Sequence, residues 1–339
     1  MGFHSQEGQV GIRTQSAKGS YANPGATAPN NGIFMRLRSG ALAGNRDLLI
    51  PDPEIGGNRD VPDAYLGPVA FSGTYDFYAR TNGLAVLLKG LLGAPVSTTV
   101  TDYKQHVFTP IDTGSLPWLS VEEYIAGGFE TFNYTDAKVN SLHVEVDAAG
   151  YLMGNAELVA LTQTSGNTKT ASPAWDETPM IVGSNCVIKW NGSNLPAKSM
   201  NFDITNNAET DDFRLGSVFL GDITEKRREF TAGCSIRPAD ASLWKTALYG
   251  SAAATTPLAG AAYKDDLQLV MTTYEVIAGA ATQKYEIVVD VAKAVIKPFE
   301  VSPSGDDVLQ HDMSIQALRP AAGTPAFTVT IKNELTAIP

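Results

Sequence analysis

The chain of 339 residues presents the same order of sequence features twice. In the first half, a segment that begins at Phe71 leads into an apolar helical pattern that stops at Gly93. In the second half, a segment that begins at Phe230 leads into a shorter helical pattern that stops at Gly250. The displacement is 159 residues between the phenylalanines and 157 between the glycines. A nearly constant displacement predicts two copies of one fold unit in tandem.

Two later matches extend the repeat. The segment Ala137–Val146 shares its Ala-Lys and Glu-Val pairs with Ala292–Val301, and Ala160-Leu161 matches Ala317-Leu318. Two similar units in one chain can occupy two equivalent places in a ring, so three chains could imitate six-fold symmetry. The alternative interpretation is that two β-rich stretches resemble each other in composition alone.

Alternation of apolar and polar residues predicts strands throughout both halves. In Ser141–Ala148, Leu142, Val144 and Val146 point to one face, and the polar residues between them point to the other. Helical spacing is confined to the leucines of 84–92 and to the short segment Ser242–Tyr249. We therefore expect a mainly β chain built from two tandem β-sandwich or barrel units, each with one short flanking α-helix.

Composition shifts along the chain suggest domain boundaries. Residues 1–30 are rich in Gly, Ser, Ala, Asn and Pro and predict a poorly packed N-terminal arm. Residues 31–165 and 181–339 are the two predicted units, and the polar, proline-containing residues 166–180 are the predicted linker. Within the first unit, Ser39–Pro68 reads as a long loop or an extended hairpin.

Motifs for catalysis or cofactor binding are absent from the sequence. Its four histidines have no metal-ligand spacing, and the chain has no GxSxG, Walker or GxGxxG motif. We therefore predict that the chain is not an enzyme and needs no cofactor. His143 and His311 are expected on a solvent-facing or inter-subunit face. Cys186 and Cys234 are expected as reduced core thiols, although a disulfide between them stays open.

The net charge of -11 disfavours a protein that grips nucleic acid, because such proteins need cations to displace counterions from phosphates. The sequence also has no run of 18 apolar residues, so we expect no membrane span.

The order of these segments resembles the major tail tube proteins of siphophages, the long-tailed bacteriophages. The resemblance rests on GQVGIRTQSAKGSYANP, the long Gly- and Pro-rich segment after IFMRLR, VAFSGTYDFYARTNGLAVLLKGLLGAP, HVFTP and LPWLSVEEY, and it is best over residues 8–165. It implies a structural subunit of tail-tube fold that is made in the host bacterial cytoplasm and resides in the virion tail. It also implies self-assembly into stacked rings around an acidic lumen that conducts DNA during ejection.

The resemblance further implies how the subunits meet. We expect a trimeric, pseudo-hexameric ring, with residues 1–30 and 39–68 reaching between stacked rings. The predicted inter-ring contact residues are Arg46, Asp47, Asp52, Glu54, Arg59 and Asp60. Tail terminator, tape measure and baseplate proteins are the expected partners. The alternatives are another virion protein of related fold (tail terminator, baseplate hub or decoration protein) or a carbohydrate-binding β-sandwich.

Overall fold

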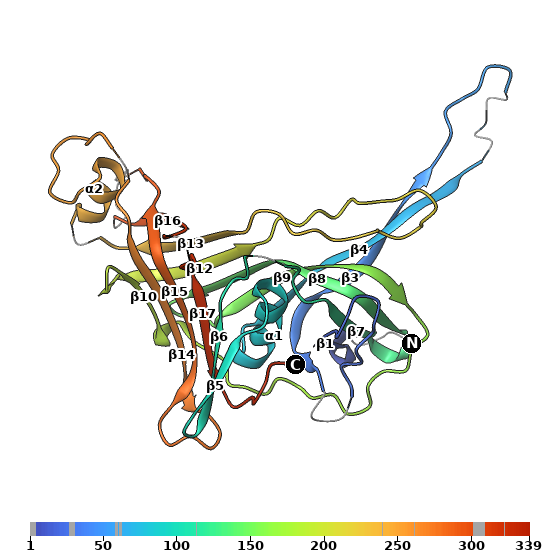
Figure 1. Cartoon of the computed structure of the whole chain (residues 1–339), viewed down its shortest axis with the longest axis horizontal. Coiled ribbons are helices and arrows are strands. Elements are labelled where there is room, and N and C mark those ends of the chain that lie inside the picture. The colour runs from blue at the N-terminus through green and yellow to red at the C-terminus, as the bar shows by residue number, and fades with distance from the viewer. Residues whose placement is uncertain are drawn as a thin grey trace.

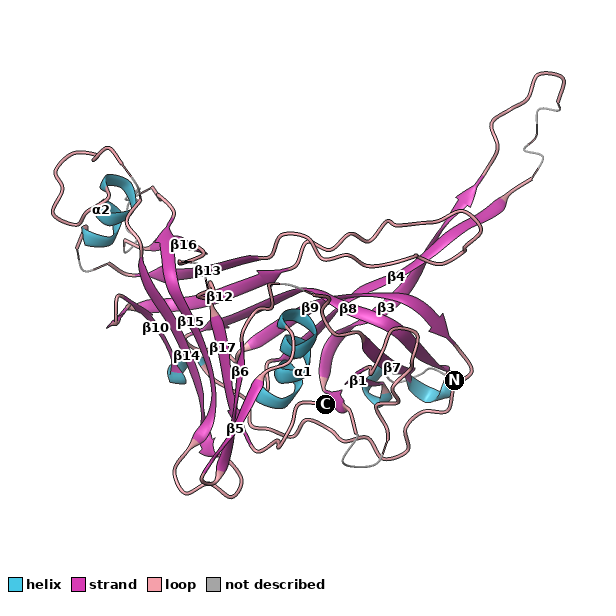
Figure 2. Cartoon of the chain, in the orientation of Figure 1, coloured by secondary structure: helices cyan, strands magenta, loops and turns pink. Residues whose placement is uncertain are grey.

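The computed structural model describes residues 5–26, 31–57, 60, 63–112, 114–238, 240–260, 262–300, 309–321 and 323–339. Strands dominate these residues and α-helices are few, so the prediction of a mainly β tail-tube-like fold is confirmed (Figure 2). The strands are β1 (Gln9–Thr14), β2 (Ile33–Met35), β3 (Leu37–Leu49), β4 (Tyr65–Tyr78), β5 (Val96–Val100), β6 (Tyr103–Phe108), β7 (Leu119–Ile125), β8 (Glu130–Asp147), β9 (Met153–Thr164), β10 (Cys186–Trp190), β11 (Ser193–Asn194), β12 (Ala197–Thr205), β13 (Glu229–Ile236), β14 (Asp265–Val276), β15 (Lys284–Ile296), β16 (His311–Ala317) and β17 (Thr328–Asn333). The α-helices are α1 (Thr81–Leu92) and α2 (Ser242–Tyr249), and three short 3₁₀ helices occupy Ser5–Glu7, Ala126–Gly128 and Gly183–Asn185.

Eight of the strands form one antiparallel strip in the order β3–β4–β9–β8–β12–β13–β16–β15. The two halves of the chain join where Ser141–Asp147 of β8 pairs with Ser199–Thr205 of β12. A single hydrogen-bonded sheet therefore runs across both predicted units.

The pairing register within this strip recurs. Ala137 of β8 faces Ala160 of β9, and Ala294 of β15 faces Ala317 of β16, so both members are displaced by 157 residues. The flanking strands repeat as well, because β4 lies between β9 and β3 as β13 lies between β16 and β12. The strands that extend the sheet from β8 and from β15 also correspond. β1 pairs with β7 and β7 with β8, as β10 pairs with β14 and β14 with β15.

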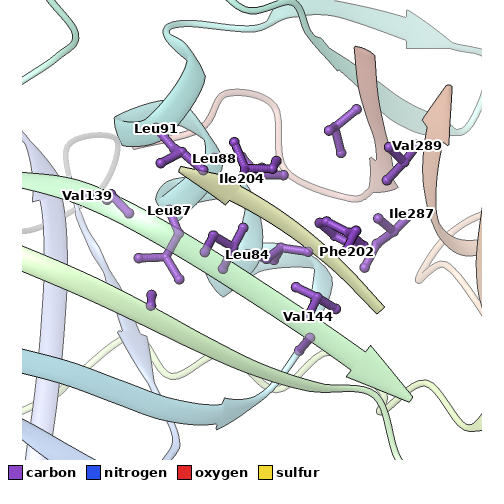
Figure 3. Packing of buried hydrophobic residues seen from close by; sticks show 14 of the residues in the cluster. Leu84, Leu87, Leu88, Leu91, Val139, Val144, Phe202, Ile204, Ile287 and Val289 are labelled. Atoms are coloured by element: carbon purple, nitrogen blue, oxygen red, sulfur yellow. The ribbon is translucent and has the colours of Figure 1, made fainter. Parts of the chain in front are cut away.

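Helix α1 packs its leucines onto the inner face of the strip (Figure 3). Eleven of its twelve residues are buried, and its neighbours in the core include Phe202 and Ile204 of β12. The helix begins at Thr81, and Arg80 is its N-cap. Gly93 ends it with a φ of 107°, a conformation that glycine adopts without strain.

The segment expected as a linker packs against the first unit. Asp176 is buried, and its Oδ2 accepts a hydrogen bond of 2.7 Å from the backbone N–H of Gly83 in the first turn of α1. A carboxylate at this position satisfies an otherwise free N–H group and complements the helix dipole. Burial nevertheless raises the pKa of Asp176.

Helix α2 lies in a lobe beyond the ends of β13 and β16 (Figure 1). It ends at Gly250 in the left-handed conformation, as its sequence predicts. In contrast to α1, this helix has one buried residue, Thr246, and Leu248 is 43% exposed. The two helices therefore occupy similar places in the chain but very different environments.

Two expectations need correction. Residues Gln9–Thr14 of the predicted loose arm form β1, which pairs with β2 and β7 and buries Val10 and Ile12. His311, expected on a solvent-facing or inter-subunit face, instead faces the core of its own chain: it is 6% exposed, and its ring lies 5.3 Å from that of Phe299. The register of β16 directs odd-numbered side chains inward, which a single histidine in a polar segment did not reveal.

The remaining expectations concern the long segment and the cysteines. Ser39–Pro68 takes the hairpin alternative: β3 and β4 pair and project from the body of the molecule (Figure 1). Cys234 is buried, Cys186 is half-buried, and both are free thiols.

Candidate functional site

The outer face of the eight-strand strip, opposite α1, is polar. On β8, Leu142 and Val144 are buried in the core, while His143 and Glu145 lie on the opposite face. Strands β12, β13 and β16 alternate in the same way, because successive residues of a strand point to opposite faces. One part of the outer face is apolar and covered, where Val159 and Leu161 of β9 pack against Leu220 and Ile223. The strip thus separates an apolar core from a broad polar surface.

Hydrogen bonds link the polar side chains of this face from strand to strand. Asp76 of β4 accepts bonds of 2.5 Å from both the Ser39 hydroxyl and the Asn155 amide. These two bonds lower the pKa of Asp76. On the next strands, Asn155 faces His143, and His143 faces Asp203. The result is a cross-strand row of polar groups that spans both halves of the chain.

His143 occupies the join between the halves. Its Nδ1 lies 2.6 Å from Oδ1 of Asp203 on β12, and its Nε2 lies 3.4 Å from Oε2 of Glu145. The hydrogen bond to Asp203, followed by the charges of Asp203 and Glu145, raises the pKa of His143. The imidazolium form is therefore stabilised by two carboxylates.

Carboxylates are numerous on the polar face. Arg38 is a cation there, and its guanidinium lies over the ring of Tyr78. The carboxylates are Asp76, Glu145, Asp147, Glu157, Asp203 and Asp312. Lysines share this face, because Lys138 of β8 and Lys293 of β15 adjoin buried, inward-facing residues, but the carboxylates outnumber the cations.

The β3–β4 hairpin is the second candidate surface and carries most of the predicted contact residues. Arg46 lies on β3, where its Nε donates a 2.8 Å hydrogen bond to the carbonyl of Gly67. The other described members, Asp47, Asp52, Glu54 and Asp60, are exposed, and Arg59 lies outside the described residues. The hairpin brings these residues together on one projecting element.

Sequence reasoning missed the apolar residues of this hairpin. Ile55 is fully exposed, and the exposed fraction is above half for each of the others. They are Leu48, Leu49, Ile50, Tyr65 and Leu66. The signal was present in DLLIPDPEI, where apolar residues adjoin prolines that prevent a buried central strand. A cluster of this kind marks an interaction surface.

A buried polar network anchors the base of the hairpin. Oε2 of Glu123 accepts hydrogen bonds of 3.0 Å from the N–H of Leu42 and from the Tyr75 hydroxyl. The Tyr134 hydroxyl donates a 2.6 Å bond to the carbonyl of Leu42. Burial raises the pKa of Glu123. Both backbone groups of Leu42 are thus satisfied by side chains.

No group of three or more His, Cys, Asp or Glu side chains within the described ranges is arranged to hold a metal ion.

Neither α-helix in the described part of the chain is long and apolar enough to cross a membrane.

Comparison with known proteins identifies the family. A model of the phage tail tube protein family matches residues 5–317, which includes both halves and the segment between them. The chain belongs to the phage tail tube protein family. Members of this family are structural rather than enzymatic components of the virion tail and self-assemble into it. No curated protein matches this tail tube chain.

Proposed function

We propose that this tail tube protein assembles into stacked rings whose inner wall is the polar face of the eight-strand strip. The acidic character of that face carries the proposal. Phosphates are held by Lys and Arg, so a wall lined by carboxylates repels DNA and lets it slide during ejection. The apolar face of the same strip is already covered by α1 and the core, which leaves the polar face for the lumen.

Three chains per ring fit the strand count. Three strips of eight strands make a 24-stranded barrel, and adjacent strands lie about 4.8 Å apart. The circumference is then about 115 Å and the diameter between backbones about 37 Å before strand tilt is added. A DNA duplex passes through such an opening.

A tandem duplication explains how three chains make a pseudo-hexamer. In this proposal, residues 31–165 and 181–339 are copies of one unit, and residues 166–180 connect them. Support comes from the recurring register, in which Ala137 and Ala160 correspond to Ala294 and Ala317.

The hairpin and the parts of residues 1–30 outside β1 are proposed to contact the next ring. The hairpin projects beyond the body of the molecule, and its exposed apolar residues are flanked by the charges of Arg46, Asp47, Asp52, Glu54, Arg59 and Asp60 (Figure 1). At the ends and inside of the tube, the proposed partners are tail terminator, baseplate and tape measure proteins.

Cryo-electron microscopy of the purified protein at high concentration tests this function. We expect stacked rings with three whole chains each and an open central channel. Six whole chains per ring would contradict the stoichiometry, and compact monomers at every concentration would contradict the tube itself.

The hairpin has its own test. Ile55→Asp should leave single rings intact and shorten the tubes severalfold, because a charge replaces a fully exposed apolar contact residue. The matched control is Leu258→Asp, which changes an exposed apolar residue in the lobe of α2. Equal tube lengths for the two variants would exclude the hairpin from ring stacking.

A further inference from the structure

We infer that the open edge of β3 in one chain pairs with the segment that follows β15 in a second copy, in the register that β12 and β8 already share inside each chain. This inference rests on the proposed function, because it specifies the seam by which copies close a ring. The join between the two halves is then the template for the join between chains.

Strand β3 has a long open edge. It is a strand of 13 residues, it pairs with β4 on one side, and within the described residues no strand covers its other side. Its counterpart β12 lies between β13 and β8, so the equivalent edge is covered. A long uncovered edge is a template for pairing with another chain.

The equivalence of β3 and β12 follows from register and burial. Gly44 faces Phe71 across β3–β4, and Ile204 faces Phe230 across β12–β13. With this displacement Leu42 corresponds to Phe202, and both are buried in the core. The edge that β8 covers on β12 therefore corresponds to the open edge of β3.

The counterpart of the covering segment follows β15. Strand pairing displaces both facing alanines by 157 residues, two more than the sequence match of Ala137 with Ala292, so the pairing register replaces that match. Ala294 then corresponds to Ala137, and Phe299 corresponds to Leu142. Both side chains face the core, and Phe299 packs against the same apolar cluster. Lys297 still donates a 2.8 Å backbone hydrogen bond to Ser314, so the chain stays beside β16 after the last residue of β15.

If β3 and the segment after β15 pair in the same register as β12 and β8, the residues that face each other between chains are defined. The template pairs are Thr205 with Ser141, Ile204 with Leu142 and Asp203 with His143. The corresponding pairs between copies are Asn45 with Pro298, Gly44 with Phe299 and Ala43 with Glu300. The seam begins beyond Leu42, whose N–H and carbonyl are already bound by Glu123 and Tyr134.

A single chain cannot make this pairing with itself. β3 and β15 are the first and last strands of the strip, seven strand spacings or about 34 Å apart along the sheet. Two-fold pairing of β3 with β3 of a second copy would leave the edge beside β15 open. Head-to-tail pairing covers both edges and closes on itself.

Disulfide formation tests the register. In a Cys186→Ala/Cys234→Ala background, the pair Ala43→Cys/Glu300→Cys should form intermolecular disulfides in assembled protein, seen as dimers and trimers on a non-reducing gel. Directly opposed residues of antiparallel strands have Cα atoms about 4.5–5.5 Å apart, within disulfide range. The positive control is His143→Cys/Asp203→Cys, which should form its disulfide within one chain.

Two further variants separate the alternatives. Ala41→Cys/Glu300→Cys, shifted by two residues, should cross-link at least fivefold less. Ala43→Cys alone should give no covalent dimer, and efficient dimerisation would overturn the inference in favour of two-fold β3 pairing. The Ala43→Cys/Glu300→Cys variant is also made with Cys186 and Cys234 in place. If the alanine background fails to assemble, this second version still tests the cross-link.

Microscopy of the same samples separates this inference from the proposed function. Rings and tubes without the Ala43→Cys/Glu300→Cys cross-link would overturn the seam and leave the tube intact. Monomers under every condition, for the unmodified chain as well, would overturn both.

Discussion

At the residue scale, polar side chains of this tail tube protein are held by partners on adjacent strands. His143 is the clearest case, because Asp203 and Glu145 flank its imidazole on the polar face. Alternation in the sequence correctly predicted that His143 lies on a polar face. Its partner Asp203 could not be predicted, because the two residues are 60 positions apart and meet through strand pairing.

The pKa of His143 is raised in the folded chain, so its ion pairs stabilise the fold below the unfolded pKa near 6.5 and lose this effect as pH rises through the folded value. We expect His143→Gln to lower the free energy of unfolding by about 0.2–1 kcal/mol at pH 5.5, a small figure because the pair is partly exposed to solvent. Urea unfolding of both proteins should show no difference at pH 9. A difference that persists unchanged at pH 9 would show that the charge is not responsible.

Glu123 has a pH linkage of the same sign as His143, but its cause is burial rather than ion pairing. Burial raises its pKa, so ionisation of the folded carboxyl is disfavoured and stability is lost as pH rises from the unfolded value through the folded value. We therefore expect Glu123→Gln to gain stability relative to the unmodified chain between pH 4 and pH 7.5. Unfolding free energies measured across this range should diverge, and parallel curves would refute the prediction.

A second substitution at the same position tests the hydrogen bonds rather than the charge. Glu123→Ala leaves the N–H of Leu42 and the hydroxyl of Tyr75 without their acceptor. The expected loss is about 1–3 kcal/mol near pH 4, from the desolvated donors, and it should shrink as pH rises because the unmodified chain then carries the cost of the buried charge.

At the scale of elements, the two helices show how packing overrides local pattern. Both follow a strand and both end at a glycine, as their sequences predict. Helix α1 is enclosed by the sheet, whereas α2 lies in a peripheral lobe (Figures 1 and 3). The denser leucine pattern of 84–92 distinguished them in part, but which faces are covered depends on distant strands such as β12 and β15.

Matched leucine substitutions measure this difference. Leu88→Ala should destabilise the chain by about 2–5 kcal/mol, because Leu88 is fully buried and truncation leaves a cavity. Leu248→Ala should change stability by less than about 0.5 kcal/mol, because Leu248 is already 43% exposed. Chemical denaturation of both variants checks the prediction, and equal losses would contradict the packing described for α1.

At the scale of the whole molecule, charge and sheet continuity combine. The net charge of the sequence predicted repulsion of DNA, but it does not indicate on which surface the carboxylates lie. The strip places Glu145, Asp147 and Asp203 on one face, because the period of a strand sorts side chains to two sides.

Charge reversal on this face tests the proposed lumen. Tubes of Glu145→Lys/Asp147→Lys should retain short duplex DNA at least tenfold better than unmodified tubes at low salt, and the gain should vanish at high salt as counterions compete. The control Asp211→Lys/Glu275→Lys makes the same change in net charge at exposed residues outside the strip. Co-sedimentation of DNA with the tubes is the measurement, and equal retention by the control would place the lumen elsewhere.

The sequence by itself determined the mainly β class, the positions of both helices and the order of features that repeats in the two halves. These properties depend on local periodicity and turn chemistry, which neighbouring residues carry. The tertiary structure decided that β1 is buried, that His311 faces inward, that Asp176 caps α1 and that β8 joins β12 in one sheet. Each of these depends on hydrogen bonds or packing between residues far apart in the chain, and no local pattern records such partners.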